Sequence, residues 1–168
     1  DLTPAQLREE CFLSVPLRIQ VGSHTVVDDA SFDQADLLWR MKECQSAPRT
    51  ACPSPAQYLD TFDCGADDVY VVTLSALLSG SHNAAAQARL LWLEEHPNAR
   101  VHIFNSCSAS AGEVLVALKI QELACSGMDF TTVVSHVSRY INEMETYFVL
   151  ETLDNLKKNG RLTKTQAL

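Results

Sequence analysis

The sequence predicts an α/β protein in which helices flank a parallel sheet. Two short β-branched apolar runs, at residues 69–74 and 101–104, have the composition of strands that are buried on both faces. A segment with helical spacing of apolar residues follows each run, at about 80–95 and 112–125. Alternating buried strands and helices are typical of parallel sheets, and these observations define the fold class.

Smaller elements are predicted in the first third of the chain. Residues 2–10 indicate a short helix, and residues 15–21 and 25–27 predict an edge hairpin that turns at Gly22 and Ser23. Ser31 with Gln34 has the spacing of a capping box. The helix that follows is expected to bury one face, made of Leu37, Leu38, Met41 and Cys44.

Prolines divide the next part of the chain. They predict that residues 48–54 form an ordered loop without regular structure. Ser54, Pro55 and Gln57 then predict the start of a helix that runs through residue 62. Farther on, a helix at about 130–142 precedes a third strand-like run at residues 147–150.

The composition of the 168 residues excludes several classes of protein. Hydrophobic residues make up 46% of the chain and charged residues 20%, which excludes a disordered chain. The apolar runs are far shorter than the roughly 20 residues of a membrane-spanning helix, and we therefore expect a soluble protein. The net charge of −8 argues against a nucleic-acid partner.

The cysteines give no sign of a metal site or of a disulfide framework. None of the six forms a C-x-x-C pair, and no secretory segment opens the chain. We therefore expect reduced thiols in a cytoplasmic protein. The first residue is Asp1 rather than methionine, which indicates a fragment.

The turns after the two buried strands are the first candidate ligand sites, because ligands of open parallel sheets bind beyond the carboxyl ends of strands. The turn from Ser75 to Ser81 is rich in hydroxyls and opens a helix, whose N-terminus favours a carboxylate or phosphate. Gly80 allows a ligand to approach the main chain closely. Ordinary helix capping by Ser79 or Ser81 is the alternative.

Two further segments are candidates. The turn after the second strand contains Asn105, Ser106 and Cys107, and Cys107 could act as a nucleophile if a histidine base were near. The five histidines are scattered without a motif, and no Gly-rich phosphate loop is present. Residues 50–55 form a proline-stiffened segment that could present a hydroxyl or simply connect two elements.

Five segments, in order along the chain, resemble the DegV family, whose members are carriers of a single long-chain fatty acid. Their family counterparts are an early PL strand, a TSQPS loop, an S-S-x-L-S-G-T turn, a DS turn and an L-x-x-L-x-x-G-G-R-I segment. In this chain they are Val15-Pro16-Leu17, Thr50-Ala51-Cys52-Pro53-Ser54, Leu74-Ser75 with Leu78-Ser79-Gly80-Ser81, Asn105-Ser106, and Leu153 through Asn159-Gly160-Arg161-Leu162.

The resemblance implies a bacterial carrier that holds the fatty-acid carboxylate in a polar pocket. The carboxylate would contact the hydroxyls of Thr50 and Ser79, the amide of Gly80 and the basic group of Arg161. Further pocket residues would be Ser75, Ser81, Asn105 and Ser106. The carrier would present its ligand to a separate fatty acid kinase, and it would have neither catalytic residues nor a cofactor of its own.

The resemblance also implies a domain organisation. Residues 1–152 would form the lipid-binding α/β domain, and residues 153–168 would lead into a second domain that is largely absent. Some family positions differ in this chain. Ala51, Cys52, Ser81, His82, Asn105 and Asn159 replace Ser, Gln, Thr, Tyr, Asp and Gly.

Two alternatives from other functional classes remain open. One is an acyl hydrolase or transferase that uses Cys107 or Ser75 as its nucleophile. The other is a protein-interaction module that docks a partner through its basic C-terminal cluster. That cluster consists of Lys157, Lys158, Arg161 and Lys164.

Overall fold

A computed structural model describes residues 2, 3, 5, 6, 9, 11–147 and 149. The described residues form a mixed α/β structure with a parallel sheet, as predicted. The chain divides into two compact units. The first comprises Asp1–Val15 and Pro53–Thr146, and the second comprises Pro16–Cys52 and Tyr147–Leu168. The predicted domain limit between residues 152 and 153 lies outside the described residues.

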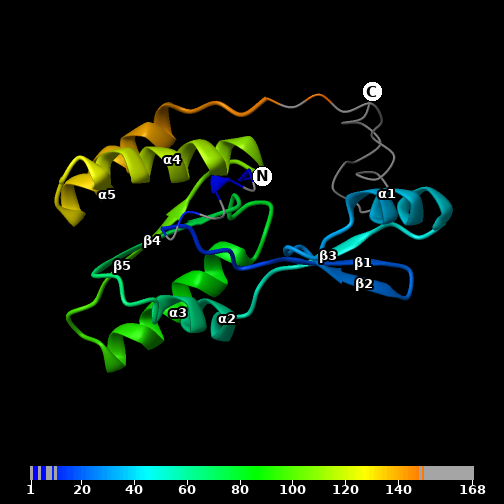
Figure 1. Ribbon diagram of the computed structural model, residues 1–168, viewed down its shortest axis with the longest axis horizontal. Helices are drawn as coiled ribbons and strands as arrows, with labels where there is room; N and C mark the ends of the chain where they lie inside the picture. The colour runs from blue at the N-terminus through cyan, green and yellow to red at the C-terminus, as the bar shows by residue number, and fades with distance from the viewer. Residues whose placement is uncertain (1, 4, 7–8, 10, 148, 150–168) are drawn as a thin grey trace. The chain divides into compact units, whose positions relative to one another are not determined.

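The first unit is built on two parallel strands, β4 (Asp68–Thr73) and β5 (Arg100–Asn105). Figure 1 shows helices on both faces of this sheet. The helices α2 and α3 cover one face, and α4 and α5 cover the other. Their bounds are Pro55–Phe62 for α2, Ser81–Glu95 for α3, Ala111–Cys125 for α4 and Phe130–Glu143 for α5.

Alternating residues of β4 enter two separate hydrophobic cores. Val69 and Val71 pack against the core beneath α2 and α3, which contains Phe62. Tyr70 and Val72 pack on the other face, against the core beneath α4 and α5. A strand that is covered on both faces needs an apolar side chain at every position, which explains the continuous apolar run in the sequence.

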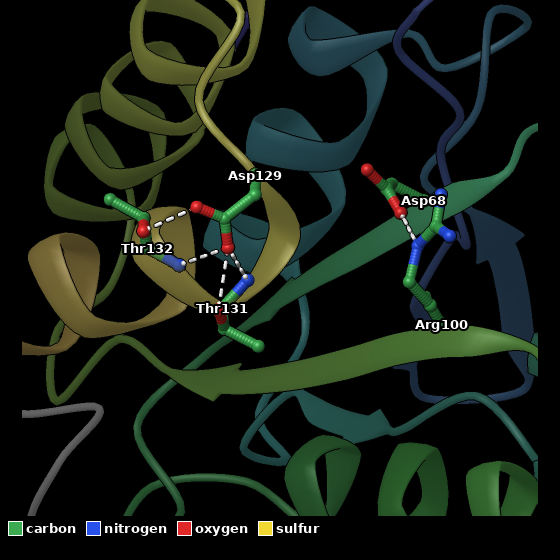
Figure 2. Close-up of polar contacts among 5 residues, drawn as sticks. All are labelled: Asp68, Arg100, Asp129, Thr131 and Thr132. Atoms are coloured by element: carbon green, nitrogen blue, oxygen red, sulfur yellow. Dashed lines mark hydrogen bonds and ion pairs between the residues drawn. The ribbon is translucent and has the colours of Figure 1, made fainter.

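The four helices predicted between residues 54 and 143 are confirmed, with shifts of one residue at some ends. Ser54 and Gln57 form the capping box of α2, as predicted. Asp129 begins α5, and its carboxylate accepts hydrogen bonds from the main-chain and hydroxyl groups of Thr131 and Thr132 (Figure 2). These bonds hold the pKa of Asp129 far below its ordinary value.

The second unit contains an antiparallel sheet. The strands β1 (Arg18–Val21) and β2 (His24–Val27) form the predicted hairpin, and Gly22 takes a positive φ in its turn. The strand β3 (Arg49–Ala51) pairs with the other edge of β1. A single helix, α1 (Gln34–Glu43), lies between β2 and β3 in the chain.

The prediction of an irregular loop at residues 48–54 is wrong for its centre. Thr50 in β3 lies opposite Ile19 in β1. The prolines at positions 48 and 53 flank these three strand residues without interrupting them. Main-chain N–H groups therefore remain available for pairing with β1.

The predicted start of α1 is also wrong. The N-cap is Asp33, whose carboxylate accepts the Asp36 amide, whereas the amide and hydroxyl of Ser31 bind Asp29. Leu37 is buried, but Leu38 is 49% exposed and lies off the buried face. The reason is helical geometry, since adjacent helix residues point about 100° apart.

Two predictions fall largely on residues outside those described. Near the start of the chain, Thr3 and Gln6 exchange the hydrogen bonds of a capping box, but the described residues form no regular α-helix there. Tyr147 and Val149 are exposed and belong to no strand. Among the described helices, none is long and apolar enough to cross a membrane.

Candidate ligand-binding site

The turns that follow β4 and β5 form one hydrogen-bonded platform at the carboxyl end of the parallel sheet. The Ser75 amide donates to the Ser108 carbonyl at 2.8 Å, and the Ser106 amide donates to the Thr73 carbonyl at 3.2 Å. The parallel register of β4 and β5 brings both turns to the same sheet edge. Two of the candidate segments from the sequence are therefore neighbours in the structure.

Asn105 joins the two turns from its position at the end of β5. Its side-chain oxygen accepts the Ala76 amide at 3.0 Å and the Cys107 amide at 3.2 Å. An aspartate at this position would supply the same acceptor with an added negative charge. Asn105 therefore provides this acceptor without a negative charge.

Three of the serines predicted to line the pocket have buried side chains. Ser75, Ser81 and Ser106 are 6%, 2% and 1% exposed. The Ser75 hydroxyl accepts the Leu77 amide, and the Ser106 hydroxyl accepts the Ser108 amide. The hydrogen bonds of Ser75 and Ser106 satisfy the main chain of the turns, which is the ordinary role of a buried serine, whereas the Ser81 hydroxyl contacts the Ser79 hydroxyl.

Ser79 and Gly80 are more accessible and lie at the N-terminus of α3. The Ser79 hydroxyl accepts the Ser81 amide at 3.2 Å and lies 2.9 Å from the Ser81 hydroxyl. Gly80 is the N-cap of α3 and makes no side-chain capping bond. In contrast, α1, α2 and α5 are capped by the side chains of Asp33, Ser54 and Asp129.

The neighbouring helix α4 has its own anion at its N-terminus. The carboxylate of Glu113 accepts the Ser110 amide at 3.1 Å. Burial raises the pKa of Glu113 above its ordinary value, although the Ser110 hydrogen bond opposes this rise. Of these two helix N-termini at the carboxyl end of the sheet, only that of α3 has no carboxylate or side-chain cap at its N-cap position.

The turn between β5 and α4 has a strained main chain. Cys107 and Ser110 have φ angles of 52° and 57°, values that residues with side chains adopt infrequently. Gly112 lies so close to this turn that an added Cβ would be 1.9 Å from the Ser108 hydroxyl oxygen. The Thr146 hydroxyl donates to that same oxygen at 2.7 Å.

Sequence reasoning missed Glu113, Ser108 and Thr146. Ser110 and Glu113 have capping-box spacing, a local signal that could have identified the Glu113 contact. Ser108 and Thr146 are 38 positions apart, and no local pattern predicts their hydrogen bond.

The remaining predicted site residues lie elsewhere. Thr50 is exposed on β3 in the second unit, whereas Ser79 belongs to the first unit. Arg161 lies outside the described residues. The proximity of Thr50 and Ser79 therefore stays a prediction.

The contacts of the two candidate nucleophiles give little support to a hydrolase. Cys107 is exposed, and within the described part of the chain no histidine forms a hydrogen bond with its sulfur. The Ser75 hydroxyl contacts a main-chain amide rather than a histidine. Among the described residues, neither nucleophile is therefore hydrogen-bonded to a histidine that could activate it.

Comparison with known proteins identifies the family. A family model described as "Uncharacterised protein, DegV family" matches residues 1–168. The chain belongs to the DegV family. A DegV domain-containing protein from Streptococcus gordonii is 42% identical over 153 residues, which cover 91% of this chain and 54% of that relative. This DegV chain spans about half the length of the curated relatives that it matches.

Two solved structures resemble the DegV chain closely. One is a DegV family protein from Ruminococcus gnavus with vaccenic acid, with a TM-score of 0.93 and 47% identity over 98% of this chain and 59% of that one. The other is the Streptococcus pneumoniae Fatty Acid Kinase (Fak) B3 protein loaded with linoleic acid. Its TM-score is 0.87, with 42% identity over 92% of this chain and 54% of that one.

Proposed function

We propose that this DegV-family chain binds a long-chain fatty acid and holds its carboxylate at the N-terminus of α3. The observation that carries this proposal is the uncapped Gly80 beside the accessible Ser79, at the carboxyl end of the parallel sheet. The relatives from Ruminococcus gnavus and Streptococcus pneumoniae, whose structures contain vaccenic and linoleic acid, support the choice of ligand.

The carboxylate would be held by few polar groups. The Ser79 hydroxyl and the Gly80 amide supply donors from the first unit, and the helix dipole of α3 favours a negative charge there. Thr50 and Arg161 would complete the contacts. The buried Ser75, Ser81 and Ser106 and the partly buried Asn105 would act through the turns that they hold in place rather than by touching the ligand.

Apolar side chains lie next to this polar turn. Leu77 and Leu78 are 96% and 46% exposed, and they directly precede Ser79. An acyl chain that covered them would remove apolar surface of both partners from water. Each buried CH₂ group contributes about 0.8 kcal/mol, so a long chain is retained without covalent chemistry.

The proposed partner is a separate fatty acid kinase in the cytoplasm of a bacterium. The name of the Streptococcus pneumoniae relative associates it with a fatty acid kinase. In this arrangement the kinase supplies ATP and the phosphoryl-transfer chemistry, and the chain acts as the carrier. The proposal therefore assigns no catalytic residue and no cofactor to this chain.

Native mass spectrometry tests the ligand directly. The full-length protein, purified from cells or incubated with oleate, should carry about one fatty acid per chain. A Ser135→Ala variant is the control, because Ser135 is exposed on α5 and away from the turns. A protein that takes up neither oleate nor palmitate would contradict the proposed function.

A further inference from the structure

A separate cavity of about 340 Å³ lies beside α3 and β5 in the first unit. Its lining consists of His82, Ala86, Arg89, Leu90, His102 and Ile103. None of the residues proposed for the fatty-acid carboxylate lines this cavity. Its volume lies at the lower end of the range for small-molecule sites.

The cavity gathers positive and protonatable groups in an acidic protein. Three of its six lining residues are basic, none is acidic, and the whole chain has a net charge of −8. Burial lowers the pKa of His102, and the nearby Arg89 and His82 lower it further. Burial and the Arg89 guanidinium thus favour the neutral form of His102, and an anion bound between them would favour its protonated form.

Arg89 is fixed in place by the main chain of β5. Its Nε donates to the Val101 carbonyl at 2.6 Å, whereas no acceptor for its terminal nitrogens lies among the described residues. A guanidinium held by one nitrogen keeps its outer N–H groups for a planar or tetrahedral oxyanion.

The same hydrogen bond argues against an added β-strand at this place. The Phe104 carbonyl faces β4, where it accepts the Thr73 hydroxyl. Because main-chain groups of a strand alternate in direction, the Val101 carbonyl faces the outer edge of β5, where a further strand would pair. The Arg89 side chain already donates to this carbonyl, so an extended segment could not pair with it. The ligand of the cavity is therefore expected to be a small molecule.

The other half of the lining is apolar. Ala86, Leu90 and Ile103 come from α3 and β5, and Leu90 is 62% exposed. A fully hydrated inorganic ion would leave these side chains without a partner. An anion with a short apolar body would cover them while its charged end meets the basic groups.

We propose that this cavity is a second ligand site, which binds a small organic oxyanion through Arg89, His82 and His102. The ligand is a carboxylate or a phosphate ester with a short aliphatic body, which packs on Leu90 and Ile103. This site is independent of the fatty-acid carboxylate site, and either can fail without the other.

Calorimetry and imidazole NMR on the full-length protein test the proposal. Hexanoate and hexyl phosphate are the two probes. Hexanol controls for binding of the apolar body alone, and inorganic phosphate controls for binding of the charged group alone. We expect at least one probe to bind saturably and at least tenfold more tightly than both controls. The probe should shift the His82 and His102 resonances, raise the pKa of His102 and leave the His136 resonances unchanged.

Variants and a competition experiment locate the binding. Arg89→Gln and His102→Gln should each weaken probe binding at least fivefold, whereas His136→Gln, on α5, should not. His102→Gln keeps the Arg89 bond to β5 and controls for destabilisation by Arg89→Gln. Binding should persist in oleate-treated protein. The absence of saturable binding, unchanged affinity in both variants, or displacement by oleate would overturn the proposal.

Discussion

At the scale of single residues, the site depends on which hydroxyls are buried and which are accessible. Ser75 and Ser106 are buried and accept main-chain amides of the turns, and the buried Ser81 hydroxyl contacts the Ser79 hydroxyl. Ser79 is more accessible, accepts the Ser81 amide and lies beside Gly80, the N-cap of α3. The sequence contains the same residue type at all four positions. Only the three-dimensional structure separates a supporting serine from one that can contact a ligand.

Replacement of Ser79 by alanine tests this distinction. The variant should bind oleate more weakly by about 1.5 to 3 kcal/mol, the usual contribution of a hydrogen bond to a charged group. Its unfolding temperature should fall modestly, because the buried Ser81 amide in the first turn of α3 loses its acceptor. Competition binding and thermal unfolding measure the two effects, with Ser135→Ala as control. Unchanged oleate affinity would limit Ser79 to helix capping.

Glu113 offers a test through pH. Its pKa is raised in the folded state, so ionisation of Glu113 costs stability as pH rises from the unfolded value of about 4.3 through the higher folded value. Glu113→Gln keeps an acceptor for the Ser110 amide and removes this cost. We expect the variant to be more stable than the parent at pH 7 and to lose that advantage by pH 4. Urea unfolding at both pH values measures it, and a difference independent of pH would contradict the assignment.

At the scale of elements, local patterns predicted most helices and both parallel strands. The capping box of α2 and the continuous apolar run of β4 are strong local signals, and both predictions are confirmed. Local patterns failed where contacts between residues far apart in the sequence determine the structure. β3 forms because β1 offers an open edge, and Asp33 rather than Ser31 begins α1 although both residue types cap helices. Similarly, no local signal predicts the Ser108 contact with Thr146.

Gly112 packs so closely against Ser108, in the turn between β5 and α4, that an added side chain should destabilise the fold. Gly112→Ala would place a methyl group 1.9 Å from the Ser108 hydroxyl oxygen and 2.6 Å from its Cβ. Because Ser108 is buried, we expect a loss of stability of about 1 to 3 kcal/mol. Chemical unfolding measures the loss. The double variant with Ser108→Gly should recover part of it, and independent, additive effects would show that the two residues do not clash.

At the scale of the whole molecule, the residues predicted to contact the carboxylate belong to different parts of the chain. Thr50 lies in the second unit and Ser79 in the first, and β3 presents Thr50 at the edge of an antiparallel sheet. The family resemblance predicts both residues as carboxylate contacts, and this stays a prediction. Neither periodicity nor capping patterns could connect them, because such patterns are local and the two residues are 29 positions apart.

An experimental structure of the full-length protein with bound oleate tests this connection. The hydroxyls of Thr50 and Ser79 should lie within about 10 Å of each other, close enough for one carboxylate and a water to bridge them. The carboxylate should be nearest to these two residues. A larger separation in the lipid-bound protein would remove Thr50 from the site.

The hydrogen bonds between the two turns also link the presence of the proposed site to the folding of the first unit. The Ala76 amide binds an acceptor 29 positions away, and the Ser75 amide is held by Ser108 across the sheet edge. Such contacts are lost when the parallel sheet opens, because no local turn can replace them. These two amides should therefore exchange hydrogen with solvent as slowly as the cores of β4 and β5, whereas the exposed Leu77 side chain needs no such opening to meet a ligand. The two turns would then stay formed as long as the first unit stays folded. Lipid could exchange without unfolding of that unit.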